Sequence, residues 1–275
     1  MPSKIRENTK MIKGNPAPDA DIQWEPAGEF TPGLVSVIMP NLNGAAFLAE
    51  AIESVTAQSY SNFELLIADD GSTDKSLPII AAAMKQDSRI RLLSAPQARQ
   101  GAAQARNRAI AAAVGEYIAF LDSDDIWCPS KLDQQISLLN EKKIHCCHGS
   151  YKTMDTNGVP FNLVNATKHV TLSNMKSYNH IGNLTGIYRC AAIGKFFQKS
   201  IGHEDYEMWI RILHHTDSIA VLSPIAHYRM HGHNVSGNKL RSALWTFQVH
   251  RNAFGLTSAC SSFIPYALQA LSKRK

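Results

Sequence analysis

Short apolar segments alternate with helical segments through the first half of the chain, and this alternation restricts the possible fold most strongly. We expect strands at 34–40, 63–68, 89–93 and 115–121, with helices at 45–58, 73–86 and 102–113 between them. Strands that alternate with helices of about 10 to 15 residues are typical of βαβ units. The pattern therefore predicts an α/β fold with a Rossmann-like, mostly parallel sheet flanked by helices.

Polar residues follow three of the expected strands, at the point where each strand ends. These runs are Asn41–Asn43, Asp69–Gly71 and Asp122–Asp125. Ligands of parallel sheets bind beyond the carboxyl ends of the strands. We therefore expect the three polar runs to converge on one binding site.

The third run carries the carboxylates Asp122, Asp124 and Asp125 directly after an apolar strand. Acids this close repel one another unless a positive charge lies among them, and a divalent cation with phosphate ligands supplies one. Alternate residues of an extended segment point the same way, so Asp122 and Asp124 can meet at one point, while Asp125 is structural. The run indicates a metal-nucleotide enzyme; a solvated acidic turn is the alternative.

The second half of the chain is less regular. We expect helices at 129–140 and 204–214, strands at 144–151, 218–222 and 226–230, loops within 165–183, and two helices within 239–275. Residues 1–32 are polar, contain several prolines and lack periodicity, which predicts a flexible lead-in.

Composition limits the classes of function. The 275 residues carry a net charge of +5, too mild to indicate nucleic acid but suited to anionic substrates or an acidic membrane face. The five cysteines include no CxxC pair, so we expect neither a disulfide framework nor a zinc ribbon. Apolar stretches stay below the roughly 18 residues that span a bilayer, and the N-terminus lacks a secretory signal. We therefore expect a cytoplasmic protein.

An ordered series of motifs resembles family 2 of the glycosyltransferases over residues 34–235. The motifs are VSVIMPNLNG (35–44), FELLIADDGSTD (63–74), ARNRA (105–109), GEYIAFLDSDDIW (115–127), HEDYEMW (203–209) and YRMH (228–231). The resemblance implies the GT-A fold and an inverting enzyme that uses nucleotide-diphosphate sugars. The stretch around Gly202–Trp209 is most similar to bacterial enzymes that extend surface-polysaccharide repeat units, such as O-antigen or capsule, on a lipid carrier.

The resemblance also implies a division of the chain. A GT-A catalytic domain spans 33–238, with a nucleotide-binding half at 33–128 and an acceptor-binding half at 129–238. A C-terminal helical segment, 239–275, follows it. That segment ends in an apolar and basic tail, which predicts either a helix on an anionic membrane face or a helix packed on the domain.

On the donor side, the resemblance assigns Asp70 to the nucleotide base. A carboxylate can accept a hydrogen bond from a ring N–H, and Gly71 permits a tight turn after it. Asp74 is instead expected to cap the next helix. The same nucleotide pocket is expected to include Pro40, Asn41 and Asn43.

We expect Asp124 to bind a Mn²⁺ or Mg²⁺ ion directly and Asp122 to contact the ribose, or the metal through water. Ser123 is assigned with them to the nucleotide-sugar site. By resemblance, His231 completes the metal site. Arg106 either pairs with the diphosphate and braces the acids, or forms a purely structural ion pair.

On the acceptor side, the resemblance makes Asp205 the general base that takes the proton from the acceptor hydroxyl. Glu204 then binds other acceptor hydroxyls or orients the base; both acids can also cap the helix that follows them. The expected acceptor is a sugar on a polyprenyl diphosphate at the inner face of the plasma membrane.

Two rival functions are a sugar-phosphate nucleotidyltransferase and a non-catalytic scaffold with the same fold. The first usually carries a basic, Gly-rich loop after the first strand, where this chain has Asn41–Ala46 without Lys or Arg. The second is expected to lose the acids or the base, and both are present.

Overall fold

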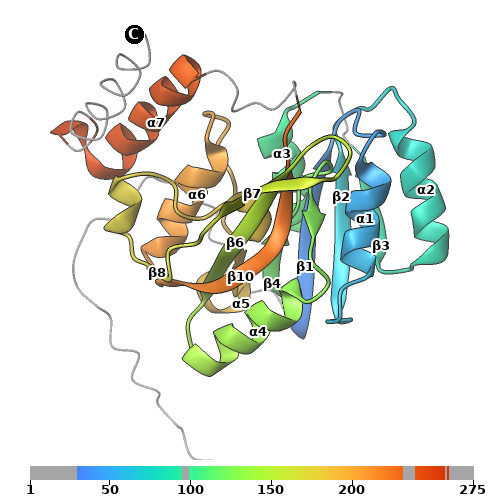
Figure 1. Ribbon diagram of the computed structural model, residues 1–275, viewed down its shortest axis with the longest axis horizontal. Coiled ribbons are helices and arrows are strands. Elements are labelled where there is room, and N and C mark those ends of the chain that lie inside the picture. The colour runs from blue at the N-terminus through green and yellow to red at the C-terminus, as the bar shows by residue number, and fades with distance from the viewer. Residues whose placement is uncertain (1–29, 95–98, 232–238, 258, 260–275) are drawn as a thin grey trace, which may run out of the picture.

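One mixed sheet runs through the computed structural model, and helices cover both of its faces (Figure 1). The structure describes residues 30–94, 99–231, 239–257 and 259. The strands are β1 (Thr31–Asn41), β2 (Phe63–Asp69), β3 (Ile90–Ser94), β4 (Gly115–Phe120), β5 (Ile126–Trp127), β6 (Cys146–Met154), β7 (Pro160–Val164), β8 (His169–Val170), β9 (Ile187–Tyr188) and β10 (Ser218–Arg229). The α-helices are α1 (Leu48–Thr56), α2 (Ser76–Gln86), α3 (Ala102–Ala112), α4 (Lys131–Lys142), α5 (Cys190–Ile193), α6 (Glu204–Leu213) and α7 (Lys239–Phe254).

The sheet has a parallel half and a mixed half. Its main order is β3-β2-β1-β4-β9-β6-β10-β5, and the pairs among the first four strands are all parallel. Beyond β4, the short strand β9 runs antiparallel to both β4 and β6, whereas β6 and β10 are parallel to each other. The predicted α/β fold is confirmed, and the carboxyl ends of β1, β2 and β4 lie at one edge.

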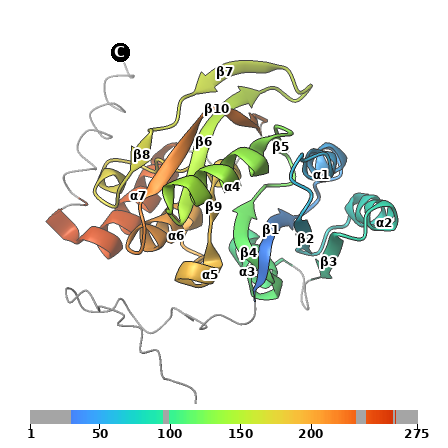
Figure 2. The same ribbon diagram turned by 90° about the horizontal axis from the view of Figure 1, so that it is seen from below.

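Each face of the sheet has its own hydrophobic core because side chains alternate along the strands. Val37 of β1 and Leu65 of β2 pack with α1 and α4 on one face. Ile38 of β1 and Leu66 of β2 pack with α3 and α6 on the other. Figure 2 shows α1 and α4 on the opposite side of the sheet from α3 and α5. The largely apolar runs of β1 and β2 therefore reflect burial on both faces of the sheet.

Most expected elements form, with ends that differ by a few residues. The helix expected from residue 73 begins at Ser76, which places Pro78 in its first turn, where the missing N–H breaks no helical hydrogen bond. The two short strands expected at 218–222 and 226–230 are one strand, β10, and that prediction was wrong. Its register against β6 shifts on both sides of Pro224, so one strand reads as two in the sequence.

The helix α7 packs beside α6 at the left of Figure 1. His203, just before α6, contacts the Ser242 hydroxyl of α7 through Nε2 at 2.8 Å. The Tyr206 hydroxyl of α6 lies 2.6 Å from Nε2 of His250. The first part of the C-terminal segment thus packs against α6, while the basic tail and nearly all of the lead-in lie outside the described residues. None of the described helices is long and apolar enough to cross a bilayer.

Candidate active site

A cleft of about 940 Å³ opens at the carboxyl ends of β1, β2 and β4, and we call it the strand-end cleft. It receives side chains from all three polar runs, from α3 and from the end of β10. Every residue assigned above to the nucleotide sugar or the metal lines it: Pro40, Asn41, Asn43, Asp70, Arg106, Asp122, Ser123, Asp124 and His231.

The first polar run is held by hydrogen bonds to the second. The Asn41 amide nitrogen donates to Oδ1 of Asp69 at 2.9 Å and to the Ser72 hydroxyl at 3.1 Å. Its own Oδ1 is buried and has no hydrogen-bond partner among the described residues. A Cβ on Gly44 would lie 2.4 Å from that oxygen, so only glycine fits beside it. Asn41 therefore lines the cleft, with its unpaired Oδ1 buried beneath the surface.

The neighbouring residue Asn43 has a φ of 51°, in the left-handed region that Asn tolerates better than most residues. Its Oδ1 accepts the Thr73 N–H at 2.8 Å, which ties the first loop to the second. Asp74 accepts the Ala45 N–H through Oδ2 and the Ser76 N–H through Oδ1, both at 2.9 Å. The N-cap residue of α2 is Lys75, so Asp74 binds the Ser76 N–H from one position before the N-cap.

The two carboxylates that end β2 are anchored in different ways. Asp69 accepts hydrogen bonds from the Gly71 and Ser72 backbone N–H groups at 3.0 and 2.9 Å. Asp70, only 2% exposed, accepts the backbone N–H groups of Gln100 and Gly101 at 3.0 and 2.7 Å. Asp70 therefore holds the start of α3 in place. This role is additional to the contact with a nucleotide base that the sequence predicts.

The three carboxylates after β4 have separate partners. Asp122 pairs with Arg106 at 2.6 Å, and Oδ2 of Asp124 lies 2.8 Å from Nε2 of His231. Asp125 is 1% exposed and accepts the Arg229 backbone N–H at 2.8 Å, as expected for a structural acid. Asp122 and Asp124 face the cleft, whereas Asp125 fixes the turn to β10.

This acidic turn has an excess of negative charge. Burial raises the pKa of Asp124, with a further contribution from Asp122, against the opposing contact with His231. Burial raises the pKa of Asp125 well above its ordinary value, and Asp124 and Asp122 add to the effect. A cation bound beside Asp124 would relieve this repulsion.

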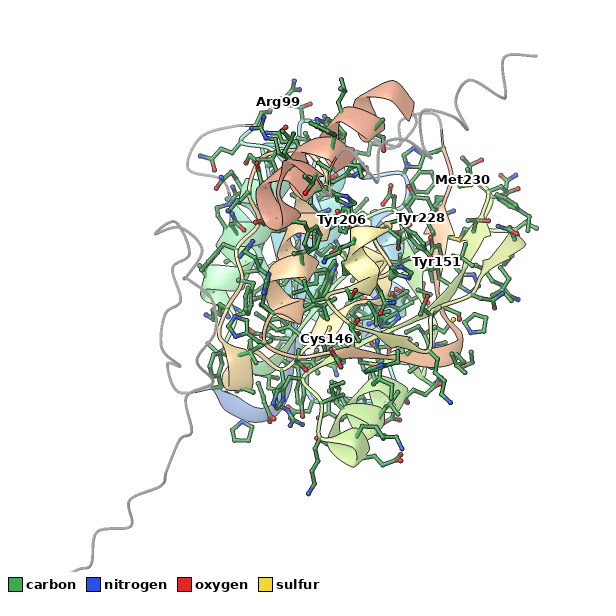
Figure 3. All side chains as sticks on the ribbon, turned by 90° about the vertical axis from the view of Figure 1, so that its left-hand side faces the viewer. Arg99, Cys146, Tyr151, Tyr206, Tyr228 and Met230 are labelled. Atoms are coloured by element: carbon green, nitrogen blue, oxygen red, sulfur yellow. The ribbon has the colours of Figure 1, made fainter. Side chains whose placement is uncertain are left out.

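A second pocket, which we call the central pocket, continues from the strand-end cleft. Both are lined by Arg106, Asp122, Asp124 and His231. The opposite wall of the central pocket carries His203, Glu204 and Asp205 at the start of α6. The rings of Tyr151 and Tyr228, seen near each other in Figure 3, also line it, with centroids 6.4 Å apart.

The Asp205 carboxylate lies in the first turn of α6. Its Oδ2 accepts a hydrogen bond from the Asn179 amide nitrogen at 3.1 Å. Burial raises the pKa of Asp205 and the adjacent Glu204 adds to the shift, while Arg106 and His203 oppose it. A carboxylate with a raised pKa in a pocket suits proton transfer.

Arg106 joins the two sides of the site. It is 8% exposed, and its Nη1 lies 3.2 Å from Oε1 of Gln198 and 3.9 Å from Oε1 of Glu204. Burial acts to lower the pKa of Arg106, but Asp122, Glu204 and Asp205 raise it overall. The guanidinium therefore stays charged between the acids of β4 and those of α6.

Residues 36–199 match the glycosyl transferase family 2. The chain is 35% identical over 246 residues to an uncharacterized glycosyltransferase of Haemophilus influenzae, spanning 88% of this chain and 98% of that one. The chain belongs to glycosyl transferase family 2. The predicted family is thus confirmed, and the protein is a glycosyltransferase.

Two further relatives of this glycosyltransferase carry more specific names. One is the Escherichia coli UDP-Glc:alpha-D-GlcNAc-diphosphoundecaprenol beta-1,3-glucosyltransferase WfgD, 36% identical over 76% of this chain and 81% of WfgD. The other is the putative teichuronic acid biosynthesis glycosyltransferase TuaG of Bacillus subtilis, 31% identical over 91% of this chain and 98% of TuaG.

Solved structures confirm the GT-A fold of this family 2 enzyme. S. aureus TarS in complex with UDP-GlcNAc superimposes with a TM-score of 0.66 at 20% identity, covering 86% of this chain and 72% of that chain. The mannosyltransferase PcManGT from Pyrobaculum calidifontis, in complex with GDP-Man and Mn²⁺, gives 0.62 at 17% identity over 87% and 79%.

Several site residues of this glycosyltransferase escaped sequence reasoning. Arg229 is 1% exposed; its side chain pairs with Glu50 at 2.6 Å, donates to the Asp124 carbonyl at 2.9 Å and lies over the Phe47 ring. The sequence could have pointed to Arg229, because this residue ends β10 and stands two residues before His231. Asn179 left no comparable signal, since it lies in an irregular loop.

Proposed function

We propose that this glycosyltransferase moves a hexose from a UDP-sugar to a hydroxyl of a lipid-linked sugar, in one inverting displacement. The observation that carries the proposal is the continuity of two pockets. The strand-end cleft holds the features of a nucleotide-diphosphate site, and the central pocket that opens from it holds Asp205. Donor and acceptor could therefore meet between Asp122 and Asp205.

The donor's nucleotide fits the strand-end cleft. Asn41 and Asp70 line this cleft, and the Asp70 carboxylate is the acceptor proposed for an N–H group of the base. The volume of about 940 Å³ is within the usual range for small-molecule sites, about 300 to 1,000 Å³. A UDP-sugar is favoured because WfgD, a relative at 36% identity, is named for UDP-Glc.

Asp124 and His231 would hold a Mn²⁺ or Mg²⁺ ion. Their ligand atoms lie 2.8 Å apart at the cleft, and the uncompensated acids around them favour a cation there. The described part of the chain contains no group of three or more His, Cys, Asp or Glu side chains placed around one metal position. The site therefore suits an ion that takes its other ligands from the donor diphosphate and water. When bound, it neutralises charge on the departing diphosphate.

Asp205 acts as the general base on the acceptor. Its carboxylate takes the hydroxyl proton as the acceptor oxygen attacks the anomeric carbon and forms the new C–O bond. The bond between that carbon and the diphosphate oxygen breaks, and the electron pair leaves with UDP. Attack from the face opposite the diphosphate inverts the anomeric configuration. Arg106 keeps Asp122 in place on the donor side while the reaction proceeds.

The acceptor sugar is carried on a polyprenyl diphosphate, and the product contributes to a bacterial surface polysaccharide. The support is the activity for which WfgD is named, together with the name of TuaG. To reach such a substrate, the enzyme would associate peripherally with the inner face of the plasma membrane. Residues 260–275, which include the basic tail, are the proposed contact.

The direct test is to incubate the purified protein with Mn²⁺, a panel of nucleotide sugars and a synthetic GlcNAc-diphosphate-lipid acceptor. We expect UDP release and a product lengthened by one hexose, with the anomeric configuration opposite to that of the donor. Pyrophosphate release from a nucleoside triphosphate would instead support a nucleotidyltransferase. No UDP release with any donor, despite UDP binding, would support a non-catalytic scaffold.

A further inference from the structure

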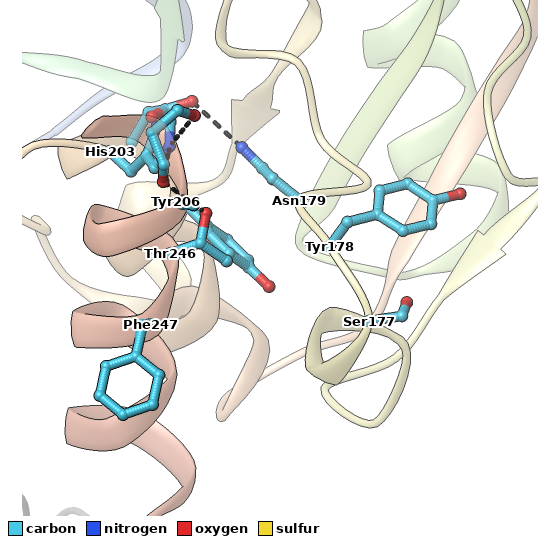
Figure 4. Close-up of a pocket in the computed structure, with 10 residues that line it drawn as sticks. Ser177, Tyr178, Asn179, His203, Tyr206, Thr246 and Phe247 are labelled. Atoms are coloured by element: carbon cyan, nitrogen blue, oxygen red, sulfur yellow. Dashed lines mark hydrogen bonds between the residues drawn. The ribbon is translucent and has the colours of Figure 1, made fainter. Parts of the chain in front are cut away.

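An irregular loop brings an amide side chain to the proposed base. A pocket of about 280 Å³, which we call the helix pocket, lies between the loop at 177–179 and the helices α6 and α7 (Figure 4). It shares His203 and Asp205 with the central pocket. On the loop side, the Asn179 amide nitrogen donates to Oδ2 of Asp205 at 3.1 Å, shown by a dashed line in Figure 4. The carboxylate is therefore contacted by a segment that lies 26 residues away in the chain.

The orientation of the Asn179 amide is fixed by a second hydrogen bond. Its Oδ1 accepts the Ile181 backbone N–H at 3.1 Å, which leaves the NH₂ group to face Asp205. This pairing is chemically consistent, because an ionised carboxylate only accepts hydrogen bonds and an amide NH₂ group donates them. A turned amide would set oxygen against oxygen and lose both bonds. Asn179 therefore fits this position in one orientation.

The loop holds Asn179 through contacts that do not involve the base. The next residue, His180, is bound at both ring nitrogens: Nδ1 lies 2.9 Å from the Thr167 hydroxyl, and Nε2 lies 3.1 Å from the Ser177 hydroxyl. After it, Ile181 is fully buried. Asn179 is thus a donor supported by its own loop, and its position does not depend on the carboxylate that it contacts.

A neutral donor distinguishes Asp205 from the structural acid two residues later. Glu207 accepts hydrogen bonds on both oxygens from Nε of Arg211, each at 2.9 Å, and lies 3.3 Å from Lys199. Two cations therefore occupy this carboxylate. Asn179 instead binds one oxygen of Asp205 without adding charge, and no other side chain among the described residues donates to this acid. Asp205 is held in place while one oxygen can still take a proton.

The charged groups that face Asp205 come from α3 and from the start of α6. Burial raises the pKa of Asp205 and Glu204 adds to the shift, whereas Arg106 and His203 oppose it. Among the described residues that line the helix pocket, the loop and α7 contribute no charged side chain. The other titratable side chains of this lining are the phenols of Tyr178 and Tyr206. Because a hydrogen bond to the ionised form lowers a pKa, loss of the amide donor should raise the pKa of Asp205.

We propose that Asn179 is a positioning residue for the transfer reaction. It holds Oδ2 of Asp205 and leaves Oδ1 to take the proton from the acceptor hydroxyl. This inference rests on the proposed function, because it needs Asp205 to be the general base. Asn179 acts only through the carboxylate that it orients.

Carbon-13 NMR of the full chain, labelled at the aspartate carboxyl carbons, measures the effect on Asp205 without any substrate. The Asp205 resonance is the one that is missing from Asp205→Asn. In Asn179→Ala the pKa of Asp205 should rise. In Asn179→Asp it should rise further, because a second carboxylate replaces the donor while an oxygen remains for the Ile181 N–H.

Transfer rates measure the consequence for the reaction. With Mn²⁺, UDP-glucose and the synthetic GlcNAc-diphosphate-lipid acceptor, both Asn179 variants should react roughly ten- to a hundredfold more slowly than the wild type, since the base is less well placed. The base must be ionised to act, so a raised pKa should also move the acid limb of the pH–rate profile to higher pH.

The matched control is Asn174→Ala, because Asn174 also fixes this segment of the chain and has no hydrogen bond to Asp205. Its Oδ1 accepts the Thr171 N–H at 2.8 Å and the Thr171 hydroxyl at 2.9 Å. Asn174→Ala should leave the pKa of Asp205 and the pH–rate profile unchanged, whatever its effect on the Tm. An unshifted pKa in Asn179→Ala, or an equal shift in Asn174→Ala, would overturn the inference.

The double variant of Asn179→Ala and Asp205→Asn separates this inference from the function beneath it. A residue that acts through Asp205 should cause no further loss of rate once Asp205→Asn is present, and a further loss would show that Asn179 acts elsewhere. If Asp205→Asn alone transfers at the wild-type rate, the proposed base is wrong. If Asp205→Asn loses transfer while Asn179→Ala changes neither the pKa of Asp205 nor the rate, only the role of Asn179 is contradicted.

Discussion

The pKa values of two carboxylates, the buried Asp69 on the donor side and the half-buried Asp205 on the acceptor side, are shifted in opposite directions. Burial alone would raise the pKa of Asp69, but hydrogen bonds from Ser72, Asn41 and Gly71 outweigh it and lower the pKa. Asp205 has a single hydrogen bond from a side chain, from Asn179, and burial leaves its pKa raised. The hydrogen bonds of Asp69 thus stabilise its ionised form, whereas the ionised form of Asp205 is disfavoured.

The difference shows how the two sides of the site are built. The donor side is made of strand ends whose loops are locked by acids such as Asp69 and Asp74 through short hydrogen bonds. The acceptor side is made of the start of α6, an irregular loop and α7. A carboxylate that costs free energy when ionised is a candidate for chemistry, because the fold gains little from it.

The largest effect is expected for Asp205→Asn. Loss of a positioned general base typically lowers the rate by about 10² to 10⁴-fold, and we expect a transfer rate reduced within that range. The amide replaces the carboxylate without changing size, so donor binding should persist. Transfer rates and UDP affinity of the purified variant measure the two effects separately. Turnover near that of the wild type would remove Asp205 from the role of base.

Asp205→Asn should also leave the fold at least as stable at neutral pH. An acid whose folded pKa is raised loses stability as the pH rises from its unfolded pKa, about 3.9, through the folded value. Replacing it removes that loss, so the Tm of the variant should equal or exceed that of the wild type at pH 7 to 8. A clear drop in Tm would mean that Asp205 serves the fold as Asp69 does.

On the donor side, the next largest effect is expected from the metal. Exhaustive chelation should lower transfer by roughly a hundredfold or more, since charge on the leaving diphosphate would lose several kcal/mol of stabilisation. Mn²⁺ or Mg²⁺ should restore activity to the wild type but not to Asp124→Asn. Full activity after the metal has been stripped, checked by elemental analysis, would refute the assignment of Asp124 and His231.

Asp69→Asn should affect stability first. Its oxygens accept two backbone N–H groups, the Ser72 hydroxyl and the Asn41 amide, and an Asn side chain would set an NH₂ group against some of these donors. The expected cost is about 1 to 3 kcal/mol in the free energy of unfolding at neutral pH. Urea unfolding measures it.

The pH dependence distinguishes Asp69 from Asp205. An acid with a lowered folded pKa contributes stability above its unfolded pKa and loses it as the pH falls through the folded value. The deficit of Asp69→Asn should therefore shrink below about pH 4, the ordinary range of an aspartate. A deficit that is unchanged at pH 3 would show that the ionised carboxylate is not what the loop requires.

The donor side could be predicted from the sequence because its residues, apart from Arg106 on α3, follow strands. Alternating strands and helices place Asn41, Asp70 and Asp122 at one edge of a parallel sheet, whatever the details of the loops. The acceptor side was predicted only through the resemblance of one motif. Asn179 meets Asp205 across an irregular segment, and Gln198 meets Arg106 from 92 residues away. No periodicity in the sequence records such contacts.

The position of His203 was missed for a related reason. Its φ is 46°, and it follows Gly202, whose φ is 70° and where a Cβ would lie 2.3 Å from the Trp245 ring. This tight approach of α7 aims His203 and Asp205 into the same two pockets. The need for glycine depends on a helix that is far away in the sequence, so the motif alone could not reveal it.

The smallest expected effect concerns whether the two sides act independently. Arg106 lies 2.6 Å from Asp122 on the donor side and 3.9 Å from Glu204 on the acceptor side. In a double-mutant cycle of Asp122→Asn and Glu204→Gln, the shared guanidinium should give a coupling of about 0.5 to 1 kcal/mol in the free energy of unfolding. Repeating the cycle in Arg106→Lys, which cannot contact both acids with the same planar fork, should abolish most of that coupling. Additive effects in the wild-type background would instead mean that donor and acceptor sides are energetically separate, and that Arg106 serves Asp122 alone.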